Sequence, residues 1–150
     1  MYIDVIEANA YFADRLHSEA WDEATETDKA KALATASKRL DLLHYRGRPV
    51  NPDQGAAFPR LVQNQFGYMV DIGIPQAVKD AVCEEALSLL AQSDFDRVRA
   101  DLRAKGVVSV RAGDASETYS EDMVKQPQIL TSAVARQLLS PFIEKAAWLV

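Results

Sequence analysis

The stretch YRGRPVNPDQGAAFPR, residues 45–60, decides how the rest of the chain is read, because it separates two helical patterns. Each of its prolines fixes its own backbone angle and disfavours a helical conformation at the residue before it. Gly47 permits the left-handed turn that commonly closes a helix. We therefore expect this stretch to form a stiff, extended arm rather than a helix.

The side chains of the arm combine positive charge with aromatic rings. Arg46, Arg48 and Arg60 offer planar charged groups, and Tyr45 and Phe58 offer large apolar anchors at the same place. Interfaces between proteins are enriched in these residue types. The pattern predicts an arm that docks onto a partner.

Composition limits the classes of protein to which the chain can belong. With 150 residues, 48% hydrophobic and 26% charged, it is typical of one globular domain, residues 1–150. A net charge of −5 argues against a protein that coats nucleic acid, because phosphate binding needs a basic surface. The lone Cys83 excludes an internal disulfide and favours a reducing compartment such as the cytoplasm. No apolar run approaches the roughly 18 residues that a membrane span needs, so we expect no membrane insertion.

Two helices are predicted before the arm. Asp4 and Glu7 have the spacing of a capping box, and Thr27 is the expected cap of the second helix, which Gly47 closes. Each helix has one apolar face at helical spacing. The two stripes are Val5, Ala8, Phe12 and Leu16, then Leu33, Ala36, Leu40 and Leu43.

After the arm, which spans about residues 46–74, helical signals return. Pro75 is tolerated in a first helical turn, and a buried stripe follows it at Val78, Val82, Ala86 and Leu89. A further short helix is expected over residues 94–104, and turn chemistry at Gly113-Asp114 predicts a β-hairpin over about 107–120. A last helix, limited by Pro141, precedes an apolar chain end.

The fold class predicted from these signals is mainly α, a small bundle of four to five helices with a long ordered arm loop over about 46–74 and a β-hairpin over about 107–120. Residues 1–106 form the bundle with its arm. Residues 121–150 carry the last helix and an apolar tail. Because exposed apolar groups usually mark interfaces, we expect Trp148, Leu149 and Val150 to dock onto a partner.

No catalytic or metal-binding constellation is visible in the sequence. His17 and His44 have no nucleophile or paired ligand near them, so we expect no enzyme, no metal and no cofactor. Single-stranded bases could stack on the aromatic residues near the arginines, which is the sharpest nucleic-acid interpretation. Those aromatic residues are Tyr45, Phe58, Phe66 and Tyr68. The alternative, favoured on composition, is that these rings pack against the bundle.

The order of several short motifs resembles the head-tail connector, or neck adaptor, family of tailed bacteriophages, whose members are often labelled DnaT-like single-stranded-DNA-binding proteins. The resemblance covers about the first hundred residues. Phe58 stands where that family would have a tryptophan. The motifs are Tyr2-Ile3, Glu7 to Phe12, Trp21, Ala32 to Leu40, Tyr45 to Arg48, Gln54, Phe58-Pro59-Arg60, Ile74-Pro75 and Val78-Lys79.

The resemblance implies a structural adaptor of the virion neck, assembled in the host cytoplasm. Such a protein would form a homo-oligomeric, dodecameric ring that joins the portal protein to a downstream connector, stopper or tail-terminator protein, with genomic DNA only passing through its lumen. Arg46, Arg48, Phe58 and Arg60 would then lie in the partner interface, together with the apolar tail. The alternative is a single-stranded-DNA-binding module of replication that uses the same arm.

Overall fold

The computed structural model describes residues 1–92, 102, 109–112, 115–118 and 129–145. Contacts divide the chain into two compact units, residues 1–90 with 129–150, and residues 91–128. In the second unit, β4 (Ser109–Ala112) and β5 (Ala115–Thr118) pair in antiparallel fashion, with Ala112 opposite Ala115. This pair confirms the hairpin predicted over about 107–120. The helix expected over 94–104 lies mostly outside the described residues.

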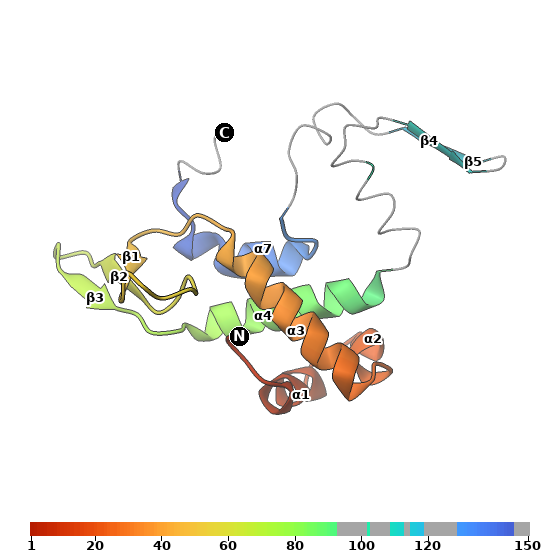
Figure 1. Ribbon diagram of the computed structural model, residues 1–150, viewed down its shortest axis with the longest axis horizontal. Coiled ribbons are helices and arrows are strands. Elements are labelled where there is room, and N and C mark those ends of the chain that lie inside the picture. Colours follow the sequence, from red (N-terminus) through yellow and green to blue (C-terminus); the bar gives the residue numbers. More distant parts are fainter. Residues whose placement is uncertain (93–101, 103–108, 113–114, 119–128, 146–150) are drawn as a thin grey trace. The chain divides into compact units, whose positions relative to one another are not determined.

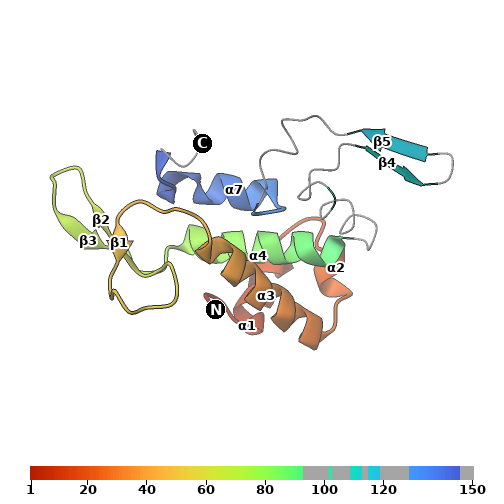
Figure 2. The same ribbon diagram turned by 45° about the horizontal axis from the view of Figure 1, so that its top comes forward.

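The first unit is helical with one small sheet, which confirms the predicted class. Five α-helices are described in it. In Figure 1, α3 crosses α4, and α7 lies along α4 on the side opposite α1. Figure 2 shows the same arrangement from a second direction. The helices are α1 (Val5–Ala13), α2 (Glu19–Asp22), α3 (Glu26–Asp41), α4 (Gln76–Ala91) and α7 (Ala133–Leu139), followed by the 3₁₀ turn η1 (Ser140–Phe142).

The first helices begin where side chains can cap them. The Asp4 side chain accepts a hydrogen bond from the Glu7 amide, as the capping-box pattern predicts. For α3 the cap is Thr25, which accepts from the Asp28 amide, so the predicted cap at Thr27 is wrong by two residues. The α1 stripe also ends early, because the helix stops at Ala13 and Leu16 is 81% exposed.

The core lies between α1, α3, α4 and α7. Trp21 stacks on Phe12 with ring centroids 4.6 Å apart, and its indole N–H donates to Asn9 Oδ1 at 2.9 Å. On α4 the predicted stripe is buried at Val78, Val82 and Ala86, which are fully inaccessible to solvent, whereas Leu89 is only partly buried. Burying such side chains is the main favourable contribution to folding, at roughly 25 cal/mol per Å² of apolar area.

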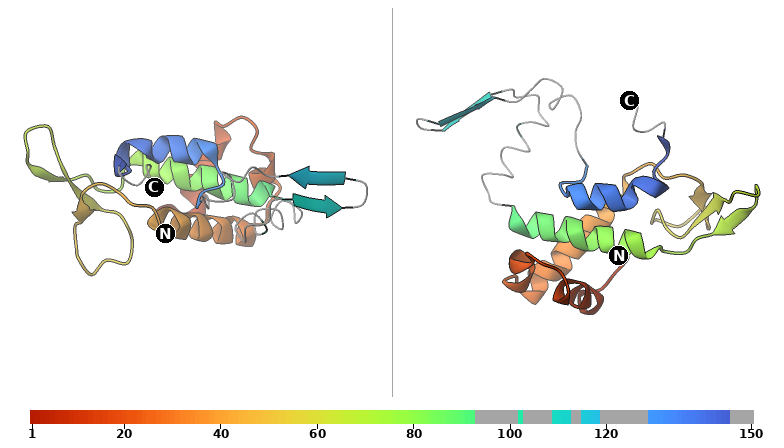
Figure 3. Two further views of the ribbon diagram at one scale, coloured as in Figure 1. Left: turned by 90° about the horizontal axis from the view of Figure 1, so that it is seen from above. Right: turned by 180° about the vertical axis from the view of Figure 1, so that it is seen from behind.

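The arm is ordered, as predicted, and it contains a small antiparallel sheet that we did not predict from the sequence. The strand order is β1 (Arg48–Pro49), β2 (Arg60–Gln63) and β3 (Met69–Asp71). Arg48 pairs with Leu61, and Val62 pairs with Val70. In both views of Figure 3 the β2–β3 hairpin projects away from the helices of its unit. This placement leaves the hairpin accessible to a partner.

Candidate binding hairpin

The β2–β3 hairpin, residues Arg60–Asp71, has a turn that is held by one asparagine. The Asn64 amide donates to the Tyr68 carbonyl at 2.8 Å, and Gly67 returns a bond to the Asn64 carbonyl at 3.1 Å. The Asn64 side-chain oxygen accepts from the amides of Phe66 and Tyr68 at 2.9 and 3.0 Å. Gly67 has φ +87°, which a side chain would rarely adopt. Bonds within the hairpin therefore hold the turn in shape.

Because Asn64 holds the turn, the side chains of Phe66 and Tyr68 are not needed for its structure, and both rings are left in solvent. Phe66 is 73% exposed and Tyr68 is 71% exposed. Met69 and Val70 follow them on β3 and are 45% and 42% exposed. Residues 61–70 contain no charged side chain. The hairpin thus presents an apolar, uncharged surface with amide groups from its glutamines and asparagine.

Arg60, at the base of the hairpin, binds the backbone of the arm. Its guanidinium donates four hydrogen bonds, to the carbonyl oxygens of Arg46 (3.0 Å), Ala57 (3.1 Å), Tyr45 (3.3 Å) and Gly47 (2.9 Å). It also lies 5.8 Å from the centroid of the Tyr45 ring. Burial lowers the pKa of Arg60. This arginine holds the arm in shape, and four of its five N–H groups are already used.

Phe58 belongs to the core beneath the arm. It is 2% exposed, and its ring makes edge contacts with Tyr45 at 4.8 Å, Tyr2 at 6.1 Å and Phe142 at 6.2 Å between centroids. The Tyr2 hydroxyl accepts from the Phe58 amide at 3.2 Å and donates to Asp41. Burial raises the pKa values of Tyr2 and Tyr45. Phe58 therefore anchors the arm to its own bundle.

Arg46 and Arg48 are the exposed arginines of the arm. Arg46 donates from its side chain to the Pro141 carbonyl, and its amide donates to the Phe142 carbonyl at 2.9 Å. Arg48 lies on β1 and has no ion pair or hydrogen-bonded side chain among the residues that the structure describes. Of the three predicted interface arginines, Arg48 is the one whose guanidinium is available to a partner. Trp148, Leu149 and Val150 lie outside the described residues.

Four cationic side chains of the helical unit are paired with carboxylates. Arg15 forms two bonds with Glu84, at 2.6 and 2.8 Å, and Lys79 lies 3.2 Å from Glu7. Burial alone would raise the pKa of Glu84, but hydrogen bonds from Arg15 and Tyr11 outweigh it and lower that pKa. These cations contribute little free positive charge to a nucleic-acid surface.

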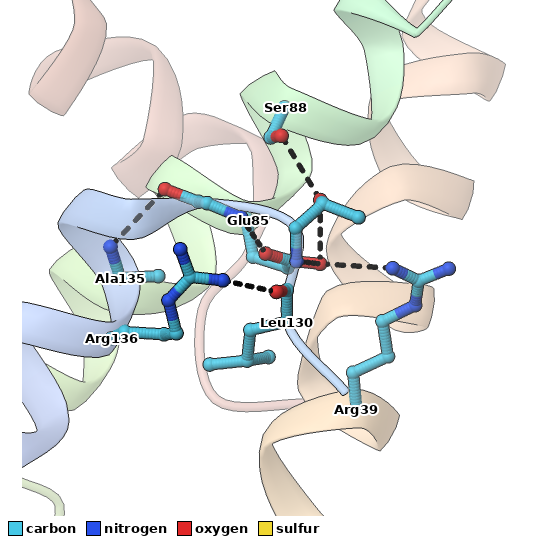
Figure 4. Close-up of polar contacts among 8 residues, drawn as sticks. Arg39, Glu85, Ser88, Leu130, Ala135 and Arg136 are labelled. Atoms are coloured by element: carbon cyan, nitrogen blue, oxygen red, sulfur yellow. Dashed lines mark hydrogen bonds and ion pairs between the residues drawn. The ribbon is translucent and has the colours of Figure 1, made fainter. Parts of the chain in front are cut away.

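A buried carboxylate fixes the position of the C-terminal helix beside the arm (Figure 4). Glu85 on α4 is fully buried and accepts from Arg39 at 3.0 Å, from the Thr131 amide and hydroxyl at 3.1 and 3.0 Å, and from the Ser132 amide at 2.9 Å. Ser132 in turn caps α7 through the Ala135 amide at 3.1 Å. This network, together with the Leu130 carbonyl that Arg136 binds at 2.8 Å, holds the start of α7 against α3 and α4.

The far end of α7 is joined to the base of the arm. Tyr45 forms an antiparallel bridge with Ile143, and the Glu144 amide donates to the His44 carbonyl at 3.0 Å. Helix α7 and the turn η1 thereby hold the first residues of the arm, and Arg60 holds the rest. The hairpin is built on this fixed base.

The structure separates the four aromatic residues that the sequence could not distinguish. Tyr45 and Phe58 are buried, whereas Phe66 and Tyr68 are exposed. The turn residues Asn64 and Gly67, between short runs of apolar residues, were a usable hairpin signal in the sequence.

Among the described residues, no group of three His, Cys, Asp or Glu side chains is placed to hold a metal ion. No helix in the same residues is long and apolar enough to cross a membrane.

The family model described as "Putative DnaT-like ssDNA binding protein" matches residues 1–149. No curated protein and no solved structure matches the chain. Because the family match covers nearly the whole sequence, the chain belongs to the family that carries this description.

Proposed function

We propose that the chain is a non-catalytic binding protein whose contact element is the β2–β3 hairpin, and that its ligand is single-stranded DNA. The observation that carries this proposal is the pair of exposed rings, Phe66 and Tyr68, on a turn that the Asn64 side chain holds in shape. Aromatic side chains bind single-stranded bases by stacking, at about 1–3 kcal/mol per base and with little sequence preference. The family description supports this ligand.

The charge of the site predicts how such binding would depend on salt. Arg48 is the available cation nearest the hairpin in the sheet, since Arg60 is committed to carbonyl oxygens. Each phosphate contact to a single strand contributes about −0.7 to the slope of log affinity against log salt. With few contacts the slope should be shallow. Arg48→Ala should reduce its magnitude by about 0.7 if Arg48 contacts one phosphate.

Fluorescence anisotropy with a labelled oligothymidine tests the proposal. The wild type should bind at low salt, and Phe66→Ala/Tyr68→Ala should weaken binding by about 5- to 150-fold for each stacked base lost. The matched control is Ile6→Ala/Leu16→Ala, which removes two apolar side chains that are 80% and 81% exposed elsewhere. Wild type that does not bind at low salt, or equal affinities for the two double variants, would exclude the proposal.

A second candidate is the head-tail adaptor that the sequence motifs suggest. The observation that favours it is the lack of charge over residues 61–70, combined with a net charge of −5, because an apolar uncharged surface suits a protein partner better than phosphates. In this case the hairpin and Arg48 would contact the portal protein, a downstream neck protein or a neighbouring copy in a ring. A ring requires a heterologous contact, in which different surfaces of two copies meet.

Two measurements distinguish the adaptor from the DNA-binding protein. The adaptor should co-purify with mature virions and occupy density between portal and tail in electron cryomicroscopy. Arg48→Ala and Phe66→Ala/Tyr68→Ala should leave the isolated chain folded but prevent joining of heads to tails. Joining that survives both changes would show that neither the hairpin nor Arg48 is the docking element.

A further inference from the structure

The two edges of the β1–β2–β3 sheet differ in what they offer to another strand. On β1, Pro49 lacks an N–H group, and proline at an edge is one of the ways in which proteins block strand addition. On β3 all three residues are exposed, and the strand contains neither proline nor lysine. One edge is therefore blocked, and the other is open to a partner strand.

The hydrogen bonds of the hairpin show which backbone groups of β3 are open. Asn64 donates to the Tyr68 carbonyl, and Ile72 donates to the Arg60 carbonyl at 3.0 Å, so Tyr68 and Ile72 face β2. In an antiparallel pair, residues alternate between facing the partner strand and facing away from it. Val70 then faces β2 as well, opposite Val62, and the backbone N–H and C=O groups of Met69 and Asp71 face outward.

We propose that this open edge pairs with the same edge of a second copy of the chain, antiparallel and centred on Val70. In this register Met69 lies opposite the partner's Asp71. The outward N–H and C=O groups of Met69 and Asp71, four on each strand, then all have hydrogen-bonding partners on the other copy. Val70 lies opposite the partner's Val70 as a non-hydrogen-bonded pair, in which side chains approach closely. The contact goes beyond DNA binding and does not depend on it.

The chemistry of the strand selects both the occupant and the register. Outward residues must oppose outward residues, so the neighbouring allowed registers are centred on Asp71 or on Met69. The first opposes two carboxylates, which is destabilising. The second places Asp71 opposite Gly67 in the turn, where the strand has ended. The register centred on Val70 places Val70 opposite Val70 and Asp71 opposite Met69, so the two carboxylates do not face each other directly and the strand is complementary to a second copy of itself.

This contact differs from the contact of a ring. A two-fold pairing uses the same surface on both copies and closes after two, whereas a ring needs two different surfaces. The strand is only three residues long, so few hydrogen bonds form and the pairing should be weak and dependent on concentration.

Sedimentation velocity over a concentration series, without DNA, tests the proposal. The wild type should show a monomer–dimer equilibrium. Val70→Lys and Val70→Glu should each weaken dimerisation at least about tenfold, because like charges then face each other. An equimolar mixture of the two variants should restore the dimer. The control Phe66→Lys changes the charge of an exposed residue in the turn, outside the paired register, and should leave the dimer unchanged.

Circular dichroism and urea unfolding of each variant show that a lost dimer is not a lost fold. A wild type that stays monomeric at millimolar concentration would overturn the proposal. So would a dimer, or a larger ring, that persists in both Val70 variants, because that result would place the contact elsewhere. Since no oligonucleotide is present, neither outcome depends on whether the hairpin binds DNA.

Discussion

Replacing Glu85 by alanine should be among the most destabilising single changes in the helical unit. Glu85 is fully buried and accepts four hydrogen bonds, from Arg39, Thr131 and Ser132. Removing one partner of a buried ion pair typically costs about 3–5 kcal/mol. The Arg39 side chain is 33% exposed and can turn to water, but the amide of the buried Ser132 would lose its acceptor. We expect a loss near the middle of that range.

Urea unfolding monitored by far-ultraviolet circular dichroism measures this loss as a difference in the free energy of unfolding. Thr131→Val removes one hydroxyl, which bonds both Glu85 and Ser88, and should cost about 1–3 kcal/mol, twice the usual net value of one hydrogen bond. Glu144→Ala, at an exposed glutamate, should cost almost nothing. A loss below about 1 kcal/mol for Glu85→Ala would refute the argument that this carboxylate holds α7 in place.

Three further predictions follow from the backbone and from buried ionisable groups. Gly47→Ala should lower the free energy of unfolding in urea by at least about 1–3 kcal/mol, because Gly47 has φ +76° and an added Cβ would lie 2.0 Å from the Leu61 carbonyl oxygen. The control Gly55→Ala should be almost neutral, because a Cβ added there meets nothing within 4 Å. Burial raises the pKa of the Cys83 thiol to about 12, so iodoacetamide at pH 8 should label it only in urea, and rapid labelling of the folded chain would contradict its placement. Burial also raises the pKa values of Tyr2 and Tyr45, so the folded state holds its phenolic protons more tightly than the unfolded state does. The stability that these protons contribute is fully present below pH of about 10 and should fall as the pH rises above it. Thermal unfolding between pH 8 and 11 can measure this fall.

Local signals in the sequence were sufficient for the helices. The Asp4 cap, the start of α4 after Pro75 and the buried stripe at Val78 and Val82 all depend on residues within one or two turns of one another, and the structure confirms them. Boundaries were less certain, because two threonines, at positions 25 and 27, could each cap α3. The structure uses the first.

The pairing of β1 and the burial of Arg60 could not be predicted because they depend on contacts between residues distant in the sequence, whereas the β2–β3 hairpin has a local turn signal that we missed. β1 is only two residues long and exists because Arg48 meets Leu61. The carbonyl oxygens that bind Arg60 come together only when the arm has folded back on itself, so an arginine that looked like an interface residue lies 8% exposed. The same folding leaves Phe66 and Tyr68 outside, where the sequence alone could not place them.

The central claim, that the turn of the hairpin contacts the ligand, is tested most directly by crosslinking from that turn. A photoreactive phenylalanine analogue at position 66 should crosslink to a single-stranded oligonucleotide on illumination, and the same analogue at position 16, replacing the similarly exposed Leu16, should not. Crosslinks from position 66 to a neck protein in infected cells would keep the hairpin as the contact element and favour the adaptor. The claim would be contradicted if position 66 formed no crosslink to any partner. It would also be contradicted if positions 66 and 16 crosslinked with equal yield.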